Sequence, residues 1–377
     1  MARKKHMVQR NTVISIAKGI AIILMVAGHA EGPELLTNFI YTFHMPLFFM
    51  AAGYFFSVKY LSDPWSFISK RIKGLYFPFL KWSILFLLLH NLWFHFGILN
   101  ETFGNWTGGV THPYTFKSAI HRLVLMVTSM SGYDEFLAGA FWFFRGLLVA
   151  SITFLLLYKL LDSKTRLKPD ACVAVICASI VGLIALRIGF NIKITTIPNG
   201  GWREMWGIVF FGLGVLYRRF ESLIGDRYWL SGLCLIFLCF AAVNHFHGMN
   251  NSGAMQDIWT LPMTGTAGFI LTHHISAIID ASGGWLRRGL VYIGNNTLYV
   301  FVFHILAFKP VSALKIWWYD LPWEQMGCHM VIHEMRPDSF WIIYTFAGVA
   351  LPLLVLVAIR KIKSARAERD TSMEVSA

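Results

Sequence analysis

Long apolar stretches recur along this 377-residue chain, and they constrain its fold more than any other feature. A helix needs roughly 17 to 25 mostly apolar residues to cross the hydrocarbon core of a bilayer. The stretches that approach this length are residues 13–30, 38–57, 75–98, 139–161, 172–190, 203–219, 229–247, 260–280, 290–308 and 339–360. Only 14% of the residues are charged, against about 25% in a soluble domain. The sequence therefore predicts an all-α, polytopic membrane protein with about ten transmembrane helices in one bundle.

The basic residues predict how the chain is oriented. The sequence has 33 Lys and Arg against 20 Asp and Glu, a formal net charge of +13. These cations gather between alternate apolar stretches, for example at 3–10, 159–168 and 360–369. Because Lys and Arg accumulate in cytoplasmic loops, we expect both termini in the cytoplasm. The same scattering argues against a nucleic-acid partner. We expect one transmembrane domain over residues 1–362 and a polar, disordered cytoplasmic tail over 363–377.

Two ionisable residues lie within the first apolar stretch. Lys18 and His29 are 11 residues apart, close to three full helical turns, so both side chains lie on one helix face. They are separated by roughly 16 Å along the helix axis. Each residue alone has an ordinary explanation, a lysine that extends to the lipid headgroups and a histidine that packs in the core. Together on one face inside a membrane, they indicate a functional site.

The second apolar stretch contributes a second histidine, His44, which is followed by Pro46. Pro46 lacks a backbone N–H, and we expect it to kink this helix. The loop between the first two stretches is short, so their helices are expected to be antiparallel neighbours with His29 and His44 close together. Neutral imidazoles suit general base catalysis near pH 7. The sequence therefore predicts His29 and His44 as catalytic residues.

A basic cluster precedes the third apolar stretch. It contains Arg71 and Lys73, with Lys81 about two turns further on. Such a cluster is first of all a signal of topology. It also offers the cations that a phosphate-bearing cytosolic ligand needs. We therefore predict Lys18, Arg71, Lys73 and Lys81 as the residues that bind the phosphates of a cofactor.

Four further residues are candidates for the wall of a pocket. Trp142 and Arg145 lie at the start of the fourth stretch, where an aromatic cluster is also typical of a membrane interface. Asn296 and His304 lie in the ninth stretch, and the neighbouring Thr297 is seven residues from His304, so these two share a helix face. The loops at 99–138 and 309–338 are rich in aromatic residues, and we expect them to cover or shape a site on the outer face.

Metal binding is only weakly indicated. His329 and His333 have a spacing that metal ligands use, and Cys328 is adjacent. The glutamate between the histidines of a zinc hydrolase helix is missing, and no second group of ligands accompanies them. We therefore predict no metal site.

The order and spacing of these motifs resembles the membrane acyltransferase-3 family, and looks most like its fucose 4-O-acetylases and related sugar O-acetyltransferases. The resemblance rests on Lys18 and His29, residues 43–49, 53–54, 70–73, 141–144 and 293–298, and His304. It covers about residues 12–308, and the first two apolar stretches are its most specific part. The family has ten transmembrane helices.

The resemblance implies an enzyme that transfers an acyl group, usually acetyl, from cytosolic acyl-CoA to a sugar hydroxyl. The acceptor is then an envelope glycan or its lipid-linked precursor, and the location the bacterial cytoplasmic membrane. His29 matches the histidine that the family's chemistry is thought to need, and Arg71 and Lys73 match its basic pair. His29 is expected to be the general base, with direct transfer and a transient acyl-histidine both open.

Two other functions fit part of the pattern. A transporter or flippase for a lipid-linked or amphiphilic sugar would use ionisable residues within its helices as a substrate or proton path. Against it, no acidic coupling residue lies deep in an apolar stretch, and Glu204 at a helix end comes nearest. A structural subunit that binds a partner through its aromatic loops leaves Lys18 and His29 unexplained. Consumption of acyl-CoA distinguishes the three.

Overall fold

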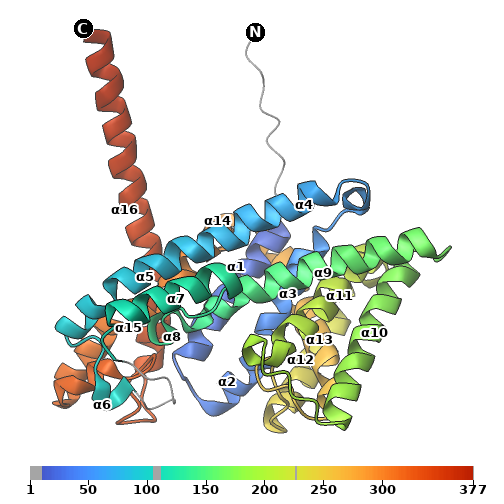
Figure 1. Ribbon diagram of the computed structural model, residues 1–377, viewed down its shortest axis with the longest axis horizontal. Helices are drawn as coiled ribbons and strands as arrows, with labels where there is room; N and C mark the ends of the chain where they lie inside the picture. The colour runs from blue at the N-terminus through green and yellow to red at the C-terminus, as the bar shows by residue number, and fades with distance from the viewer. Residues whose placement is uncertain (1–10, 105–111, 226, 377) are drawn as a thin grey trace.

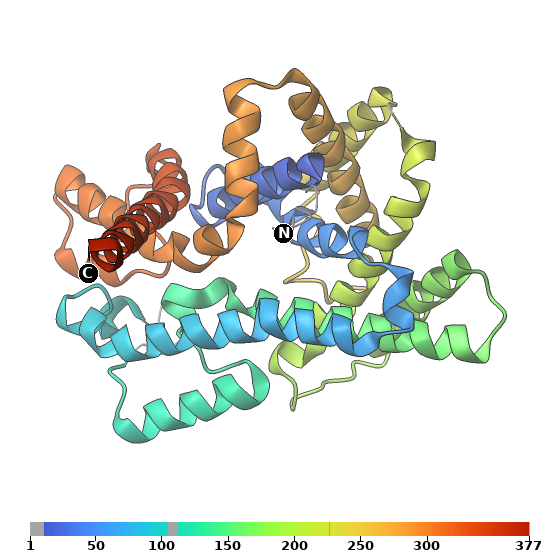
Figure 2. The ribbon, with the colours of Figure 1, turned by 90° about the horizontal axis from the view of Figure 1, so that it is seen from above.

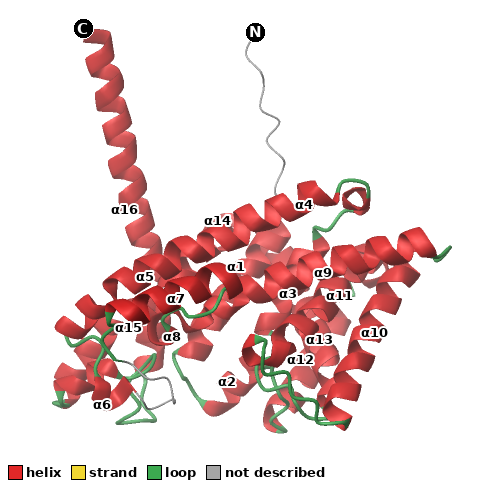
Figure 3. Cartoon of the chain, in the orientation of Figure 1, coloured by secondary structure: helices red, strands yellow, loops and turns green. Residues whose placement is uncertain are grey.

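The computed structural model describes residues 11–104, 112–225 and 227–376, and within these ranges the regular elements are helices without any strand (Figures 1 and 3). The α-helices are α1 (Thr12–His29), α2 (Glu34–Tyr41), α3 (His44–Tyr54), α4 (Pro64–Arg71), α5 (Phe77–His95), α6 (Glu101–Gly104), α7 (Phe116–Ser129), α8 (Glu135–Ala138), α9 (Trp142–Lys164), α10 (Pro169–Gly189), α11 (Trp202–Ile224), α12 (Tyr228–Val243), α13 (Asp257–Ser282), α14 (Gly284–Asn295), α15 (Thr297–Tyr319) and α16 (Phe340–Ser376). Short 3-10 turns occur at Val58–Leu61, Gly139–Phe141, Pro198–Gly201 and Trp323–Gly327.

Seven helical segments of the described chain are long and apolar enough to cross a membrane. They are Thr12–His29, Glu34–Tyr54, Pro64–His95, Glu135–Lys164, Pro169–Gly189, Thr297–Tyr319 and Phe340–Arg366, and α12 is a shorter apolar helix. The predicted spans at 203–219 and 260–280 correspond to α11 and α13, which are long helices with several polar side chains. The chain is therefore an all-α, multi-pass membrane protein, as its sequence predicts.

Three helix boundaries differ from the sequence-based expectation. The predicted span 290–308 is divided, because α14 ends at Asn295 and α15 begins at Thr297. Pro46 does not kink a continuous helix; the break lies earlier, at Phe43, and Pro46 occupies the first turn of α3, where a missing N–H is tolerated. Residues 363–376, expected to be disordered, continue α16 as helix and project from the bundle (Figure 1).

A π-helical turn joins α4 to α5 at Ile72–Tyr76 and keeps the two helices in one long rod. This rod runs alongside α9 in both views of the ribbon (Figures 1 and 2). The turn contains Lys73, whose side chain is exposed. π-helical turns of this kind occur often at functional sites.

Glycines allow the central helices to approach closely. The α-carbon of Gly53 in α3 lies against the backbone of Phe211 in α11, and a β-carbon there would overlap the Phe211 carbonyl. At a second contact, Gly294 of α14 faces the backbone of Ser15 in α1 in the same way. Helix contacts between small residues are typical of membrane proteins, where packing replaces the hydrophobic effect.

Buried lysines hold the long loop after α15 against the bundle. Lys309 donates hydrogen bonds from Nζ to the carbonyls of Met326 (2.7 Å) and Cys328 (3.0 Å). Lys315 donates to the Ile332 carbonyl (3.1 Å) and forms an ion pair with Asp338 (2.6 Å). These contacts fix the loop over the end of α1 that carries His29. We call this end of the bundle the His29 end.

Candidate active site

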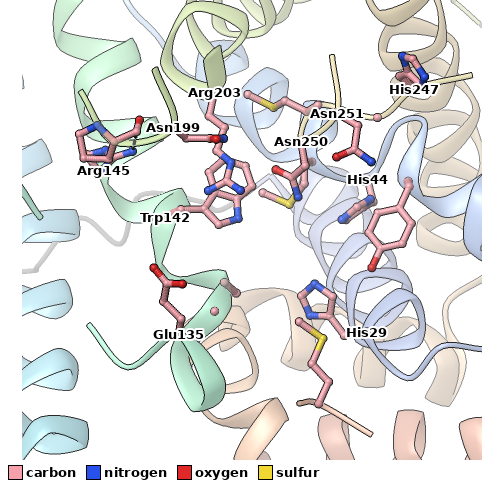
Figure 4. A pocket seen from close by; sticks show the side chains of 18 of the residues that line it. His29, His44, Glu135, Trp142, Arg145, Asn199, Arg203, His247, Asn250 and Asn251 are labelled. Carbon is pink, nitrogen blue, oxygen red and sulfur yellow. Dashed lines mark hydrogen bonds between the residues drawn. The ribbon is translucent and has the colours of Figure 1, made fainter. Parts of the chain in front are cut away.

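A cavity of about 800 Å³ lies at the His29 end of the bundle (Figure 4). His29 is the last residue of α1 and His44 the first of α3, so two helix ends deliver imidazoles to one space. Trp142 and Arg145 from the first turn of α9 line the same space, as Arg203 does from the first turn of α11. Four predicted residues therefore meet here, although they belong to three helices.

His29 is hydrogen-bonded to another histidine. Its Nδ1 lies 2.8 Å from Nε2 of His304 in α15, and the two rings are nearly parallel, at an interplanar angle of 20°. His304 is buried behind His29, with 1% of its surface exposed. The sequence predicted His304 as a pocket residue. It predicted His44, rather than His304, as the histidine close to His29.

Backbone carbonyls determine which nitrogens of this pair carry protons. Nδ1 of His304 faces the carbonyls of Phe301 (3.0 Å) and Val300 (3.2 Å), which only accept hydrogen bonds. Nδ1 of His304 is therefore the protonated nitrogen, and in the neutral ring Nε2 accepts. His29 then donates from Nδ1 to His304, so the lone pair of His29 is on Nε2. This is the tautomer of a general base whose other nitrogen is held by a positioning group.

His44 has a separate set of contacts. Its Nδ1 donates to the Ile40 carbonyl (2.9 Å), which leaves the lone pair of the neutral ring on Nε2. Tyr41 packs edge-on against its ring, at 5.2 Å between centroids, and donates from its hydroxyl to the Gly28 carbonyl beside His29 (3.2 Å). His44 thus faces the cavity with its own orientation rather than as the hydrogen-bonding partner of His29.

Two arginines on the opposite wall differ in how their charge is balanced. Arg145 forms a buried ion pair with Glu204, at 2.7 Å from Nε to Oε1, and donates to the Pro198 carbonyl (3.3 Å). Arg203 instead lies over the ring of Trp142, with 4.4 Å between the guanidinium carbon and the ring centroid. The sequence drew attention to Arg145 and Glu204 but did not identify Arg203 as a site residue.

Amide side chains supply much of the remaining polar surface. Asn199 lies in the turn before α11, and Asn250 and Asn251 lie in the loop before α13; all three line the cavity. That loop is held by Asp257, which accepts a hydrogen bond from His247 (3.0 Å) and another from the Ala254 N–H (2.7 Å). Amides offer donors and acceptors together, as a polyhydroxylated ligand requires.

Two loops close the cavity on its remaining sides. Glu135 and Phe136 come from α8, and His329 and Met330 from the loop that Lys309 anchors. Burial lowers the pKa of His329 below its usual value, although the hydrogen bond to the Glu135 carbonyl opposes this shift. The sequence indicated both loops as parts of the site, but not these residues.

The predicted phosphate-binding residues do not line this cavity. The Arg71 guanidinium carbon lies 4.8 Å from the ring centroid of Phe67 and 5.6 Å from that of Phe211 in α11. Lys73 is exposed in the π-helical turn. Lys81 lies over the ring of Trp82, with 4.4 Å between Nζ and the ring centroid. Lys18 is half-buried on α1, eleven residues before His29.

Asn296 also lies away from the cavity. Its Oδ1 accepts a hydrogen bond from Arg360 (2.9 Å), and its Nδ2 donates to the Tyr292 carbonyl (2.7 Å). The adjacent Asn295 accepts from Ser15 in the first turn of α1 (3.2 Å). Asn296 therefore belongs to the opposite end of the bundle, where it connects α15 to α16.

The two histidines with metal-ligand spacing do not converge. His329 lines the cavity, whereas His333 faces Glu31 at 3.0 Å in a neighbouring hollow of about 430 Å³. Within the described ranges, no group of three or more His, Cys, Asp or Glu side chains has the arrangement of a metal site.

Comparison with known families agrees with the arrangement of the motifs. A family model described as an acyltransferase domain, that of the acyltransferase-3 family, matches residues 11–360. The chain belongs to the acyltransferase-3 family. No curated protein and no solved structure matches it in the corresponding searches. The protein is therefore a membrane acyltransferase. The helices that carry His29 and His44, α1 and α3, both lie within the matched residues.

Proposed function

We propose that this acyltransferase moves an acetyl group from cytosolic acetyl-CoA to a sugar hydroxyl, with His29 as the general base. The observation that carries the proposal is the hydrogen bond between His29 Nδ1 and His304 Nε2, which directs the basic nitrogen of His29 to the cavity. A general base needs this combination of a fixed tautomer and access to substrate.

The transfer step proceeds as follows. The acceptor hydroxyl gives its proton to His29 Nε2, and its oxygen attacks the carbonyl carbon of the thioester. The tetrahedral intermediate collapses with cleavage of the carbon–sulfur bond, and the CoA thiolate takes the proton from the His29 imidazolium. His304 holds the ring throughout by accepting from Nδ1, and so acts as a positioning residue.

The donor enters from the side opposite the cavity. Arg71 and Lys73 at the π-helical turn, with Lys18 and Lys81, supply cations for the phosphates of CoA. The face of α1 that carries Lys18 leads to His29 over roughly 16 Å, a path that the pantetheine arm follows with the thioester at its tip. The bias of Lys and Arg toward alternate loops supports a cytoplasmic position for these cations. The proposed location is the bacterial cytoplasmic membrane.

The lining of the cavity favours a sugar as the acceptor. Asn199, Asn250 and Asn251 provide amides, and Trp142 provides an aromatic side chain, a combination that recognises hydroxyl groups and the apolar face of a sugar ring. An envelope glycan or its lipid-linked precursor fits a cavity at a membrane surface. The volume of about 800 Å³ lies within the range of roughly 300 to 1,000 Å³ for small-ligand sites.

The decisive experiment follows radiolabelled acetyl from acetyl-CoA with the purified protein in nanodiscs. The wild type is expected to bind acetyl-CoA and to release acetate slowly when no sugar is present. His29→Ala should bind acetyl-CoA normally and lose this turnover. His121→Ala serves as a matched control, because His121 is exposed on α7, outside the cavity. Full turnover by His29→Ala would exclude the mechanism, and failure of the wild type to bind acetyl-CoA would favour another acyl donor or transport of a sugar.

A further inference from the structure

Arg203 lines the cavity, and its guanidinium forms no ion pair with any residue that the structure describes. Among the described residues, no carboxylate lies within ion-pair distance of its guanidinium. Its Nε is buried and has no hydrogen-bonding partner. Glu204, the nearest carboxylate in sequence, is already paired with Arg145. In the described chain, the cavity wall therefore contains one arginine that is paired with a carboxylate and one that is not.

The structure holds Arg203 in place without giving it an anion. Its guanidinium lies 4.4 Å from the ring centroid of Trp142, a cation–π contact that tolerates partial burial of the charge. The backbone before it turns sharply, with positive φ at Asn199, Gly200 and Gly201, and this turn starts α11 at the edge of the cavity. The N-terminus of α11 adds partial positive charge at the same place.

A partly buried arginine with free donors is suited to an oxyanion. The guanidinium forms paired hydrogen bonds with carboxylate or phosphate, and these are stronger than neutral hydrogen bonds. Burying the Arg203 charge without an anion costs free energy, which an anionic ligand would recover. Glu135, the carboxylate that lines the cavity, forms no ion pair with Arg203 in the described chain, so an incoming anion does not have to displace it.

Arg203 and His29 lie on opposite sides of the cavity in Figure 4, with Trp142 beside Arg203. We infer that Arg203 binds an anionic group on the acceptor, so that the preferred acceptor is a sugar unit with a carboxylate or phosphate. The Arg203–Trp142 pair then fixes one end of the sugar, and a hydroxyl at the other end reaches His29. This inference rests on the proposed function, because it assigns the acceptor of that reaction.

The test compares three small acceptors: methyl β-D-glucuronide, methyl β-D-glucoside 6-phosphate and the neutral methyl β-D-glucoside. Binding to the full-length protein in nanodiscs is measured by ligand-observed NMR, and acetyl transfer is measured in parallel. The wild type should bind at least one anionic glycoside about tenfold more tightly than the neutral one, the effect of roughly one charge-assisted hydrogen-bond pair. The anion that gains more identifies carboxylate or phosphate as the natural group.

Variants of Arg203 connect the preference to this residue. Arg203→Gln should bind all three glycosides equally, and Arg203→Lys should keep only part of the preference because it lacks the planar fork. Arg166→Gln is the control, since Arg166 is exposed in the loop after α9. An unchanged preference in Arg203→Gln would overturn the inference. So would a wild type that does not distinguish charged from neutral glycosides, a result that requires no variant to fold.

The outcomes separate this inference from the proposed function. Acetyl transfer that depends on His29 but shows no preference for an anionic acceptor refutes only the assignment of Arg203. An anion preference that depends on Arg203, in a protein that turns over no acetyl-CoA, refutes the acetyltransferase and leaves the binding site. Higher salt should weaken binding of the anionic glycosides and leave the neutral one unchanged.

Discussion

The histidine pair is the feature of this site that depends most on single atoms. His29 gains its reactive tautomer from His304, and His304 gains its own from two carbonyls of α15. Neither imidazole needs a carboxylate, which would be costly to bury at this depth. In the proposed mechanism, His304 performs the positioning that an aspartate performs in a serine hydrolase triad.

Replacing His304 should lower the rate without weakening donor binding. We expect His304→Ala to reduce kcat about 10- to 100-fold, the effect of one lost hydrogen bond of roughly 1.5 to 3 kcal/mol. KM for acetyl-CoA should stay the same, because the cations expected to bind it do not line the cavity. Steady-state kinetics measures both. A rise in KM with unchanged kcat would show that His304 supports donor binding instead.

Lys309 should be more important for stability than its place in an apolar helix suggests. Lys309→Met leaves the carbonyls of Met326 and Cys328 without their donor, at a cost of roughly 1 to 3 kcal/mol each. Thermal unfolding in detergent should show a lower midpoint. Lys117→Met, at an exposed position of α7, is the control and should leave the midpoint unchanged. Equal midpoints for both variants would contradict this role.

Sequence reasoning identified site residues where a rare residue type stood out from apolar neighbours. His29, His44 and Arg145 are conspicuous for that reason, and they line one cavity. Arg203 was missed, and His329 was considered only for its metal-ligand spacing, because both lie near helix ends or in loops, where charged and polar residues are common. Only the folded chain shows that Arg203 has no ion-pair partner among the residues that the structure describes, since pairing depends on distances between distant segments.

Individual helices were predictable because apolar length is a local property. The junctions between helices were harder to predict. The span at 290–308 crosses from α14 to α15, since residues 290–293 at the end of α14 are apolar, as α15 is, and only Asn295 and Asn296 mark the break. His304 was expected to share a face with Thr297, as it does in α15, but its position behind His29 follows from how α15 packs. Hydropathy contains no information on that packing.

The contact between α1 and α14 should be intolerant of one methyl group. A β-carbon at Gly294 would overlap the Ser15 carbonyl, so Gly294→Ala must separate the helices at a cost of about 1 to 3 kcal/mol. Gly232→Ala is the matched control, because Gly232 lies within α12 and faces open space. The midpoint of thermal unfolding of Gly232→Ala should stay the same as that of the wild type or rise slightly. Equal loss in both variants would contradict the close contact.

An acidic loop residue ties distant parts of the chain together. Glu31, just after α1, accepts a hydrogen bond from Arg336 and lies 3.0 Å from His333, both in the loop after α15. Burial alone would raise the pKa of Glu31, but these partners outweigh it and hold the pKa below its usual value. Because the folded state favours the carboxylate, its stabilisation is complete above the unfolded pKa and is lost as the pH falls through the folded pKa.

Acidification should therefore reveal the contribution of the contacts between Glu31 and the loop after α15. The thermal midpoint of the wild type should fall as the pH is lowered from about 5 to about 3, around and below the ordinary pKa of glutamate, and the fall should be smaller in Glu31→Gln, which has no carboxylate to protonate. Glu334→Gln, at an exposed position of the loop after α15, should show the same pH dependence of the thermal midpoint as the wild type. Identical pH dependence in all three proteins would show that Glu31 does not couple the two loops.

The two ends of α1 have a consequence for the cell. In the proposed mechanism Lys18 meets the donor at one end and His29 meets the acceptor at the other, so the reaction is vectorial. Spent CoA returns to the compartment from which acetyl-CoA came, while the ester forms in a compartment that contains no such high-energy donor. Under the proposed mechanism, the cell acetylates glycans on its exterior while CoA stays in the cytoplasm, and the membrane separates the donor from the product.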